Sequence, residues 1–139
     1  VILWLAECEV ELGNLASAET YVNLIRNRAK TGSVQDASIT YAVNPYPAGT
    51  FAAKGADYAR NAVRMESRLE FAMEGHRFFD LVRWGTDVTT LNAYLSYESK
   101  YLVTKFGGAS YQATDKYLPI PQAQIDIQGS SILKQNAGY

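Results

Sequence analysis

Three glutamates and their neighbours form the group of side chains best suited to acid–base chemistry. Glu66, Glu70 and Glu74 recur at intervals of four residues, and His76 and Asp80 follow closely. Glycoside hydrolysis needs two carboxyl groups that face each other across the scissile bond, about 5 to 9.5 Å apart. Side chains four apart on one helix lie about 5 to 6 Å apart at Cβ, but they point the same way. A hydrolase that uses Glu70 and Glu74 is therefore an alternative hypothesis, and we expect no catalytic residue.

Arginines around these glutamates favour a structural explanation. Arg60, Arg64 and Arg68 follow one another at the same four-residue spacing, and Arg77 and Arg83 lie just beyond. Guanidinium and carboxylate groups form strong charge-assisted hydrogen bonds. We therefore predict that the glutamates take part in an ion-pair network. The sequence contains neither a G-x-S-x-G elbow nor an H-E-x-x-H motif, which would indicate a nucleophile or a zinc site.

Aromatic residues are the second group that could contact a ligand. The chain has ten tyrosines, and several lie in predicted loops: Tyr41, Tyr46, Tyr97, Tyr101 and Tyr111. A tyrosine ring offers an apolar face for stacking on a sugar and a hydroxyl for hydrogen bonds. We predict ligand binding by Tyr41, Tyr46, Phe51 and Tyr111. Packing in a core or an interface is the alternative for each of these rings.

The elements that must position these residues are predominantly helical. Within residues 1–30, apolar side chains recur at spacings of three and four on both sides of a break at Gly13 and Asn14. Glycine ends helices and asparagine caps them, so the break predicts two helices joined by a short turn and packed antiparallel. The small residues Ala6, Gly13 and Ala18 lie where a tetratricopeptide-like hairpin needs close approach.

The remaining segments alternate between loops and helices. Residues 31–56 contain prolines and glycines without a sustained period and predict a long loop. Residues 57–99 predict helices separated at Gly75 and Gly85, with Thr86 as a cap, and residues 100–139 predict a loop and a C-terminal tail. The first of these helices should present one apolar face: Ala62, Met65, Leu69, Ala72 and Met73. The predicted fold class is mostly α.

Composition excludes several classes of protein. The 139 residues are 47% apolar and 19% charged, as in a globular domain, and a formal charge of −1 gives no field to attract nucleic acid. A single cysteine, Cys8, and a single histidine provide no zinc-ligand set, and we expect no cofactor. The sequence has no membrane-spanning run and no signal peptide, so we expect a membrane address outside this chain and regard it as a C-terminal piece of a longer protein.

Two motifs in the second half of the chain resemble the signatures of one family. Residues 68–85 read RLEFAMEGHRFFDLVRWG, residues 118–121 read LPIP, and residues 135–139 read QNAGY, in which Ala137 replaces a usual proline. These segments are similar to the SusD/RagB family of outer-membrane nutrient-binding lipoproteins. The resemblance implies that residues 1–139 are the C-terminal portion of one SusD-like domain. It also implies an architectural role for a set of motif residues: Glu70, Glu74, Gly75, Arg77, Asp80, Arg83 and Trp84.

The resemblance also implies a function. Members of this family capture glycans, or in some cases peptides, at the outer-membrane surface and pass them to a SusC-like TonB-dependent transporter. Such a protein reaches the membrane only through a lipid anchor, which would lie upstream of this chain, and Cys8 is not the anchor cysteine. A peptide-binding or protein-interaction module built on the helical hairpin remains the alternative from another class.

Overall fold

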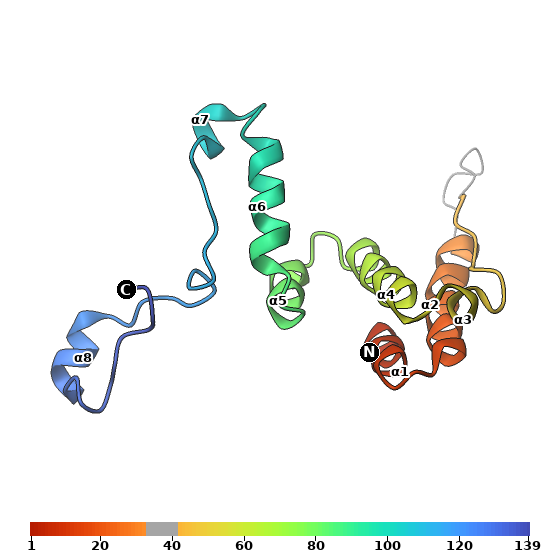
Figure 1. The fold of residues 1–139 in the computed structure, drawn as a ribbon, viewed down its shortest axis with the longest axis horizontal. Helices are drawn as coiled ribbons and strands as arrows, with labels where there is room; N and C mark the ends of the chain where they lie inside the picture. The colour runs from red at the N-terminus through yellow and green to blue at the C-terminus, as the bar shows by residue number, and fades with distance from the viewer. Residues whose placement is uncertain (33–41) are drawn as a thin grey trace. The chain divides into compact units, whose positions relative to one another are not determined.

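The computed structural model describes residues 1–32 and 42–139, and within these ranges the chain forms eight helices and no strand (Figure 1). The predicted fold class, mostly α, is confirmed. Contacts divide the chain into two compact units, Val1–Glu74 and Gly75–Tyr139. Each unit is described by itself below.

The first unit begins with a helical hairpin. Helix α1 spans Ile2–Glu11 and helix α2 spans Leu15–Thr31. Gly13 turns the chain with φ of 82°, a left-handed conformation that side chains with a Cβ rarely adopt. Asn14 occupies the N-cap position of α2, but its side-chain amide donates to Glu9 Oε2 (2.7 Å) instead of accepting from the helix. The turn therefore depends on Gly13 more than on a capping side chain.

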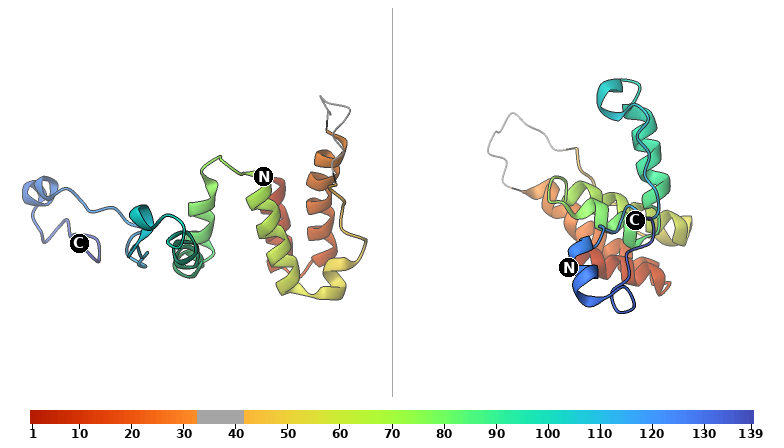
Figure 2. Two further views of the ribbon diagram at one scale, coloured as in Figure 1. Left: turned by 90° about the horizontal axis from the view of Figure 1, so that it is seen from above. Right: turned by 90° about the vertical axis from the view of Figure 1, so that its left-hand side faces the viewer.

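Two further helices complete the first unit. Helix α3 spans Thr50–Lys54, and helix α4 spans Ala56–Glu70 and contacts both α1 and α2. Figure 2 shows α1, α2 and α4 beside one another, with α3 near one end of the three. Their shared core consists mainly of small and β-branched side chains with one ring: Leu3, Ala6, Val10, Ala18, Val22, Ile25, Phe51, Ala59, Ala62 and Val63. Small residues let the helices approach closely.

Helix α3 lies inside the segment that the sequence predicted as a loop. A five-residue helix is too short to form on local propensity, since helix nucleation is unfavourable. Here a residue that is distant in the sequence supplies hydrogen bonds that stabilise the start of the helix. The carboxylate of Glu19 on α2 accepts hydrogen bonds from the backbone N–H groups of Gly49 and Phe51, both at 2.8 Å. Tertiary contacts therefore create α3, and local pattern gave no sign of it.

The buried face of α4 differs from the predicted one. The helix ends at Glu70, so Ala72 and Met73 lie in the turn that follows. Met65 and Leu69 are 50% and 60% exposed, whereas the buried residues are Ala59, Ala62, Val63, Glu66 and Ser67. Only Ala62 belongs to both sets. The sequence prediction placed the face with the bulky side chains in the core, and this was wrong. The face that contacts α1 and α2 carries small residues and an ion-paired glutamate instead.

The second unit has four short helices joined by turns and extended segments. Helix α5 spans His76–Arg83, helix α6 Asp87–Glu98, helix α7 Val103–Phe106 and helix α8 Gln122–Gln128. Helix α6 contacts both α5 and α7. Thr86 precedes α6 as predicted, but its side chain makes no capping hydrogen bond.

Side chains of the C-terminal motif hold the tail to the segment before α8. The amide of Gln135 accepts from Ile120 N–H (2.7 Å) and donates to Ile120 C=O (2.9 Å), and Asn136 Nδ2 donates to Leu118 C=O (2.7 Å). A Cβ at Gly138 would lie 2.8 Å from Thr114 Cβ, and the backbone there has φ of 99°. Glycine is therefore the residue that fits this position. The QNAGY motif therefore holds the C-terminal tail against the segment that precedes α8.

An exposed ion pair between α1 and α4 gives a pH-dependent prediction. Arg60 Nε and Nη2 donate to the two carboxylate oxygens of Glu11 at 2.7 and 2.9 Å. These hydrogen bonds hold the pKa of Glu11 below its ordinary value. The pair therefore stabilises the fold fully above that ordinary value, about 4.3, and loses its contribution as pH falls through the lower folded pKa.

The measurement is the melting temperature of the unmodified protein and of Glu11→Gln from pH 7 to pH 3. We expect a small difference at pH 7, because the side chain of Glu11 is 53% exposed, and a difference that shrinks as the pH falls. High salt should reduce it as well. A gap between the two proteins that grows at low pH would contradict the assignment.

Candidate functional site

Three aromatic rings form a cluster beside α2. The ring of Phe51 lies 5.1 Å from that of Tyr46 and 6.0 Å from that of Tyr58, centroid to centroid, and all three pairs meet edge to face. Phe51 is fully buried, whereas Tyr46 is half-buried. A ring without exposed surface cannot stack on a sugar. The structure therefore corrects the prediction for Phe51, whose pattern of contacts is that of a core residue.

Helix α2 pins the segment that carries Tyr46. The side-chain amide of Asn23 donates to Tyr46 C=O (3.0 Å) and accepts from Tyr46 N–H (2.7 Å). Arg26 Nε donates to Asn44 C=O (2.7 Å), and its guanidinium carbon lies 4.8 Å from the centre of the Tyr46 ring. Burial raises the pKa of the Tyr46 hydroxyl. Tyr41, another predicted ligand residue, lies outside the residues that the structure describes.

Tyr111 lies in the second unit, in an extended segment held against α6. The amide of Asn92 donates to Tyr111 C=O (2.8 Å) and accepts from its N–H (2.9 Å). The hydroxyl donates to Asp87 Oδ2 (3.1 Å), and the ring meets Phe78 edge to face at 6.2 Å. Burial, followed by the hydrogen bond to Asp87, raises the pKa of this hydroxyl. Tyr111 is half-buried, with both its backbone and its polar tip engaged.

The glutamates of α4 pair with arginines of α2. Glu66, which is buried, accepts from Arg26 Nη1 at 2.8 Å, and Glu70 forms an ion pair with Arg28. Two of the three predicted acidic members, Glu66 and Glu70, form ion pairs, and their partners come from another helix. Glu74 lies in the turn after α4, so it does not continue the helical ridge of Glu66 and Glu70. This arrangement gives no support to a hydrolytic pair at Glu70 and Glu74.

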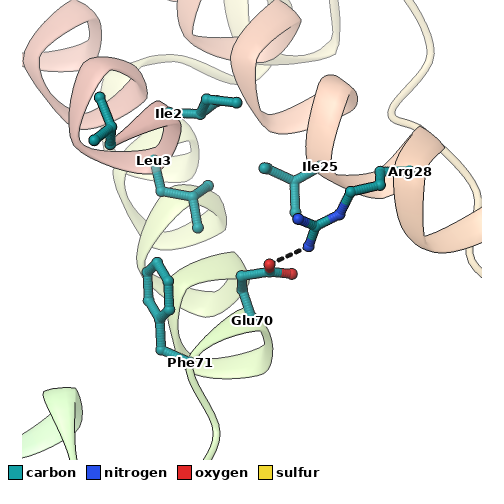
Figure 3. A pocket seen from close by; sticks show the side chains of 7 residues that line it. Ile2, Leu3, Ile25, Arg28, Glu70 and Phe71 are labelled. Atoms are coloured by element: carbon teal, nitrogen blue, oxygen red, sulfur yellow. Dashed lines mark hydrogen bonds and ion pairs between the residues drawn. The ribbon is translucent and has the colours of Figure 1, made fainter. Parts of the chain in front are cut away.

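A hollow of about 280 Å³ lies at the end of the hairpin, next to the ion pair of Glu70 (Figure 3). Its walls are mainly apolar, and the residues that line it are Val1, Ile2, Leu3, Ile25, Arg28, Glu70 and Phe71. The figure shows Arg28 and Glu70 pointing toward each other, joined by a dashed line. The lining contains no hydroxyl, thiol or imidazole group, so the hollow could hold a small apolar group but offers no nucleophile.

Residues of the family motif contact one another at the end of α5. Asp80 accepts from Arg83 Nη2 (3.2 Å), and the guanidinium carbons of Arg77 and Arg83 lie 5.7 and 5.5 Å from the centre of the Trp84 ring. Cations near an indole face are stabilised by its quadrupole. Gly75 is the N-cap residue of α5 and adopts a left-handed conformation with φ of 78°. This geometry favours the architectural role that we predicted for the motif.

Sequence reasoning missed the polar side chains that hold extended segments in place. In three places one amide bonds both the N–H and the C=O of a single distant residue: Asn23 with Tyr46, Asn92 with Tyr111 and Gln135 with Ile120. Each amide thus replaces the partner strand that the extended residue lacks, which is necessary because unpaired backbone groups are costly when buried. No local signal identifies these residues, since the partners are 15 to 23 positions away.

Metal binding and membrane crossing both find no support in the described residues. Within residues 1–32 and 42–139, no three His, Cys, Asp or Glu side chains gather in a way that could hold a metal ion. In the same part of the chain, none of the helices has the length and apolar character needed to cross a bilayer.

Comparison with known proteins identifies the family. The sequence profile of the SusD family matches residues 1–139. SusD-like protein P25 of Formosa agariphila is 36% identical over 129 residues, which cover 91% of this chain and 20% of that protein. The chain thus spans about a fifth of the length of this relative. Because the match extends along its whole length, the chain belongs to the SusD family.

Proposed function

We propose that this protein captures oligosaccharides at the outer-membrane surface, without catalysis, and delivers them to a SusC-like TonB-dependent transporter. Its attachment to the membrane would be a lipid anchor outside this chain. The observation that carries the proposal is the family match over residues 1–139. The 36% identity to a SusD-like protein agrees with this match.

The geometry of the acidic residues supports a binding role over hydrolysis. A glycosidase needs two carboxyl groups that face each other across the scissile bond. Glu66 and Glu70 are instead each engaged by an arginine of α2.

Within the described residues, Tyr46 and Tyr111 remain the predicted ligand contacts. Both keep part of the ring exposed, in contrast to Phe51. Each is held by an amide that bonds its backbone, so the ring is positioned before a ligand arrives. Such preorganisation lowers the entropic cost of binding. Tyr41 stays a proposal from the sequence.

Calorimetric titration of the complete gene product tests the proposed function. The probes are starch, laminarin, xylan and alginate as soluble polysaccharides and a mixture of oligopeptides, with a parallel assay for new reducing ends. We expect saturable binding to one glycan class and no increase in reducing ends. Release of reducing ends would show hydrolysis, and binding to oligopeptides alone would show peptide capture. Either result would overturn the proposal.

A further inference from the structure

A polar ridge along α2 holds the segment that precedes α3. Four side chains spaced three or four residues apart lie on the same side of the helix: Glu19, Asn23, Arg26 and Lys30. Their partners follow in the opposite direction along the chain: Phe51 and Gly49 for Glu19, Tyr46 for Asn23, and Asn44 for both Arg26 and Lys30. We call residues 44–47 the strap.

The strap is stiff because its sequence is NPYP. Pro45 and Pro47 fix their own φ angles, and each proline also restricts the residue before it to extended conformations. Proline has no N–H group, so the N–H of Tyr46 is the single backbone donor of residues 45–47, and Asn23 accepts it at 2.7 Å. A stiff segment cannot release Asn44 from α2 while it keeps Tyr46 in place. The contacts of the strap should therefore break together.

Burial changes sharply between the strap and α3. Within the strap, Asn44 and Pro47 are exposed, and Pro45 and Tyr46 are half-buried. Phe51 of α3, by contrast, is fully buried. Segments with few buried apolar contacts open at a lower free energy than segments anchored in the core. The strap should therefore open while α3 stays bound.

A turn at Gly49 separates the strap from α3. The N–H of Thr50 donates to Pro47 C=O (3.1 Å), and Gly49 has φ of 81° in this turn. Glycine adopts left-handed and right-handed conformations about equally readily. A Cβ at Gly49 would meet nothing within 4 Å, so the space around the turn is open. The chain can therefore change direction here.

Arg26 contacts the strap and the core at the same time. Its Nε donates to Asn44 C=O (2.7 Å), and its Nη1 donates to Glu66 Oε2 (2.8 Å). Glu66 is buried, and a buried charge that loses its partner is strongly destabilising. When the strap leaves α2, Arg26 can keep its ion pair with Glu66. Opening the strap therefore does not require a buried charge to lose its partner.

We infer that the strap lifts from α2 as one unit about Gly49, while α3 keeps its place. The movement separates the ring of Tyr46 from those of Phe51 and Tyr58, which it meets edge to face in the closed arrangement. It also breaks the paired hydrogen bonds between Asn23 and the backbone of Tyr46. This conformational device goes beyond the proposed function and does not depend on it.

Native-state hydrogen exchange in the complete gene product tests this inference at three backbone amides. Arg26→Lys keeps a positive charge but lacks the fork geometry that serves two acceptors. The amide of Tyr46 should then exchange about tenfold faster, although its own acceptor is Asn23, because the loss of one charge-assisted hydrogen bond shifts the opening equilibrium by about that factor. The amides of Gly49 and Phe51, which Glu19 holds, should keep their exchange rates.

Arg28→Lys is the matched control. It makes the same change two positions along α2, in a residue that pairs with Glu70 of α4, and should leave the Tyr46 amide unaffected. An unchanged Tyr46 amide in Arg26→Lys would show that the contacts of the strap open separately. Equal acceleration at Tyr46 and Phe51 would show that α3 opens with the strap. The inference fails in both cases.

Discussion

Replacing Phe51 with alanine should lower the free energy of unfolding by about 3 to 5 kcal/mol, the range found for truncation of a fully buried aromatic ring. Among residues 1–32 and 42–139, the ring is the largest side chain with essentially no exposed surface, and it meets Tyr46 and Tyr58 edge to face. Its removal would leave a cavity between α2, α3 and α4 and would end both ring contacts. The free energy of unfolding of the complete gene product, measured with denaturant, checks this expectation.

The control for this prediction is Phe79→Ala. Phe79 is 71% exposed, so the same chemical change there should alter the unfolding free energy by no more than about 0.5 kcal/mol. Phe51→Leu, which keeps most of the volume, should cost less than half as much as alanine. A Phe51→Ala protein with unchanged stability and lost glycan affinity would instead restore Phe51 as a ligand contact.

The sequence predicted those parts of the fold that depend on local pattern. Apolar spacings of three and four indicated α1 and α2, and Gly13 marked the turn between them. Gly75 and Gly85 bracket α5, because both adopt left-handed conformations in which glycine is favoured. These features could be predicted since each depends on a few neighbouring residues.

Features that depend on distant partners could not be predicted in this way. The pattern of α4 showed which of its residues share a face, but α1 and α2 decide which face is buried. Arg26 and Arg28 pair with Glu66 and Glu70 across 40 and 42 positions, and no spacing rule connects them. Periodicity describes one helix at a time, whereas ion pairs and burial are properties of the packed unit.

The candidate ligand residues also show the difference between what local sequence predicts and what depends on distant contacts. Composition drew attention to tyrosine, but a loop position does not make a ring accessible. Phe51 lies in the predicted loop and is nevertheless buried, because the carboxylate of Glu19 draws the segment onto α2. Tyr97 and Tyr101 are more exposed than the half-buried Tyr46, and only the structure distinguishes them.

The carboxylate of Glu19 is also the basis of the second prediction with a large expected effect. Glu19 is 6% exposed and accepts one backbone hydrogen bond on each oxygen, from Gly49 and from Phe51. A hydrogen bond to a charged group contributes about 1.5 to 3 kcal/mol, and loss of the acceptor would leave both N–H groups without a partner. We therefore expect Glu19→Ala to lower the unfolding free energy by about 3 kcal/mol and to loosen α3.

Hydrogen exchange measures the loss of these hydrogen bonds at the backbone amides of Gly49 and Phe51. In the complete gene product carrying Glu19→Ala, the amides of Gly49 and Phe51 should exchange much faster than in the unmodified protein, since their acceptor is gone. Glu19→Gln should show an intermediate effect, because the amide oxygen can accept one of the two bonds while the NH₂ group faces the other donor. Glu98→Ala, which removes a half-buried glutamate of α6, serves as the control and should leave both amides protected. Unchanged exchange in Glu19→Ala would mean that α3 forms without the carboxylate, and that burial of Phe51 alone holds this segment on α2.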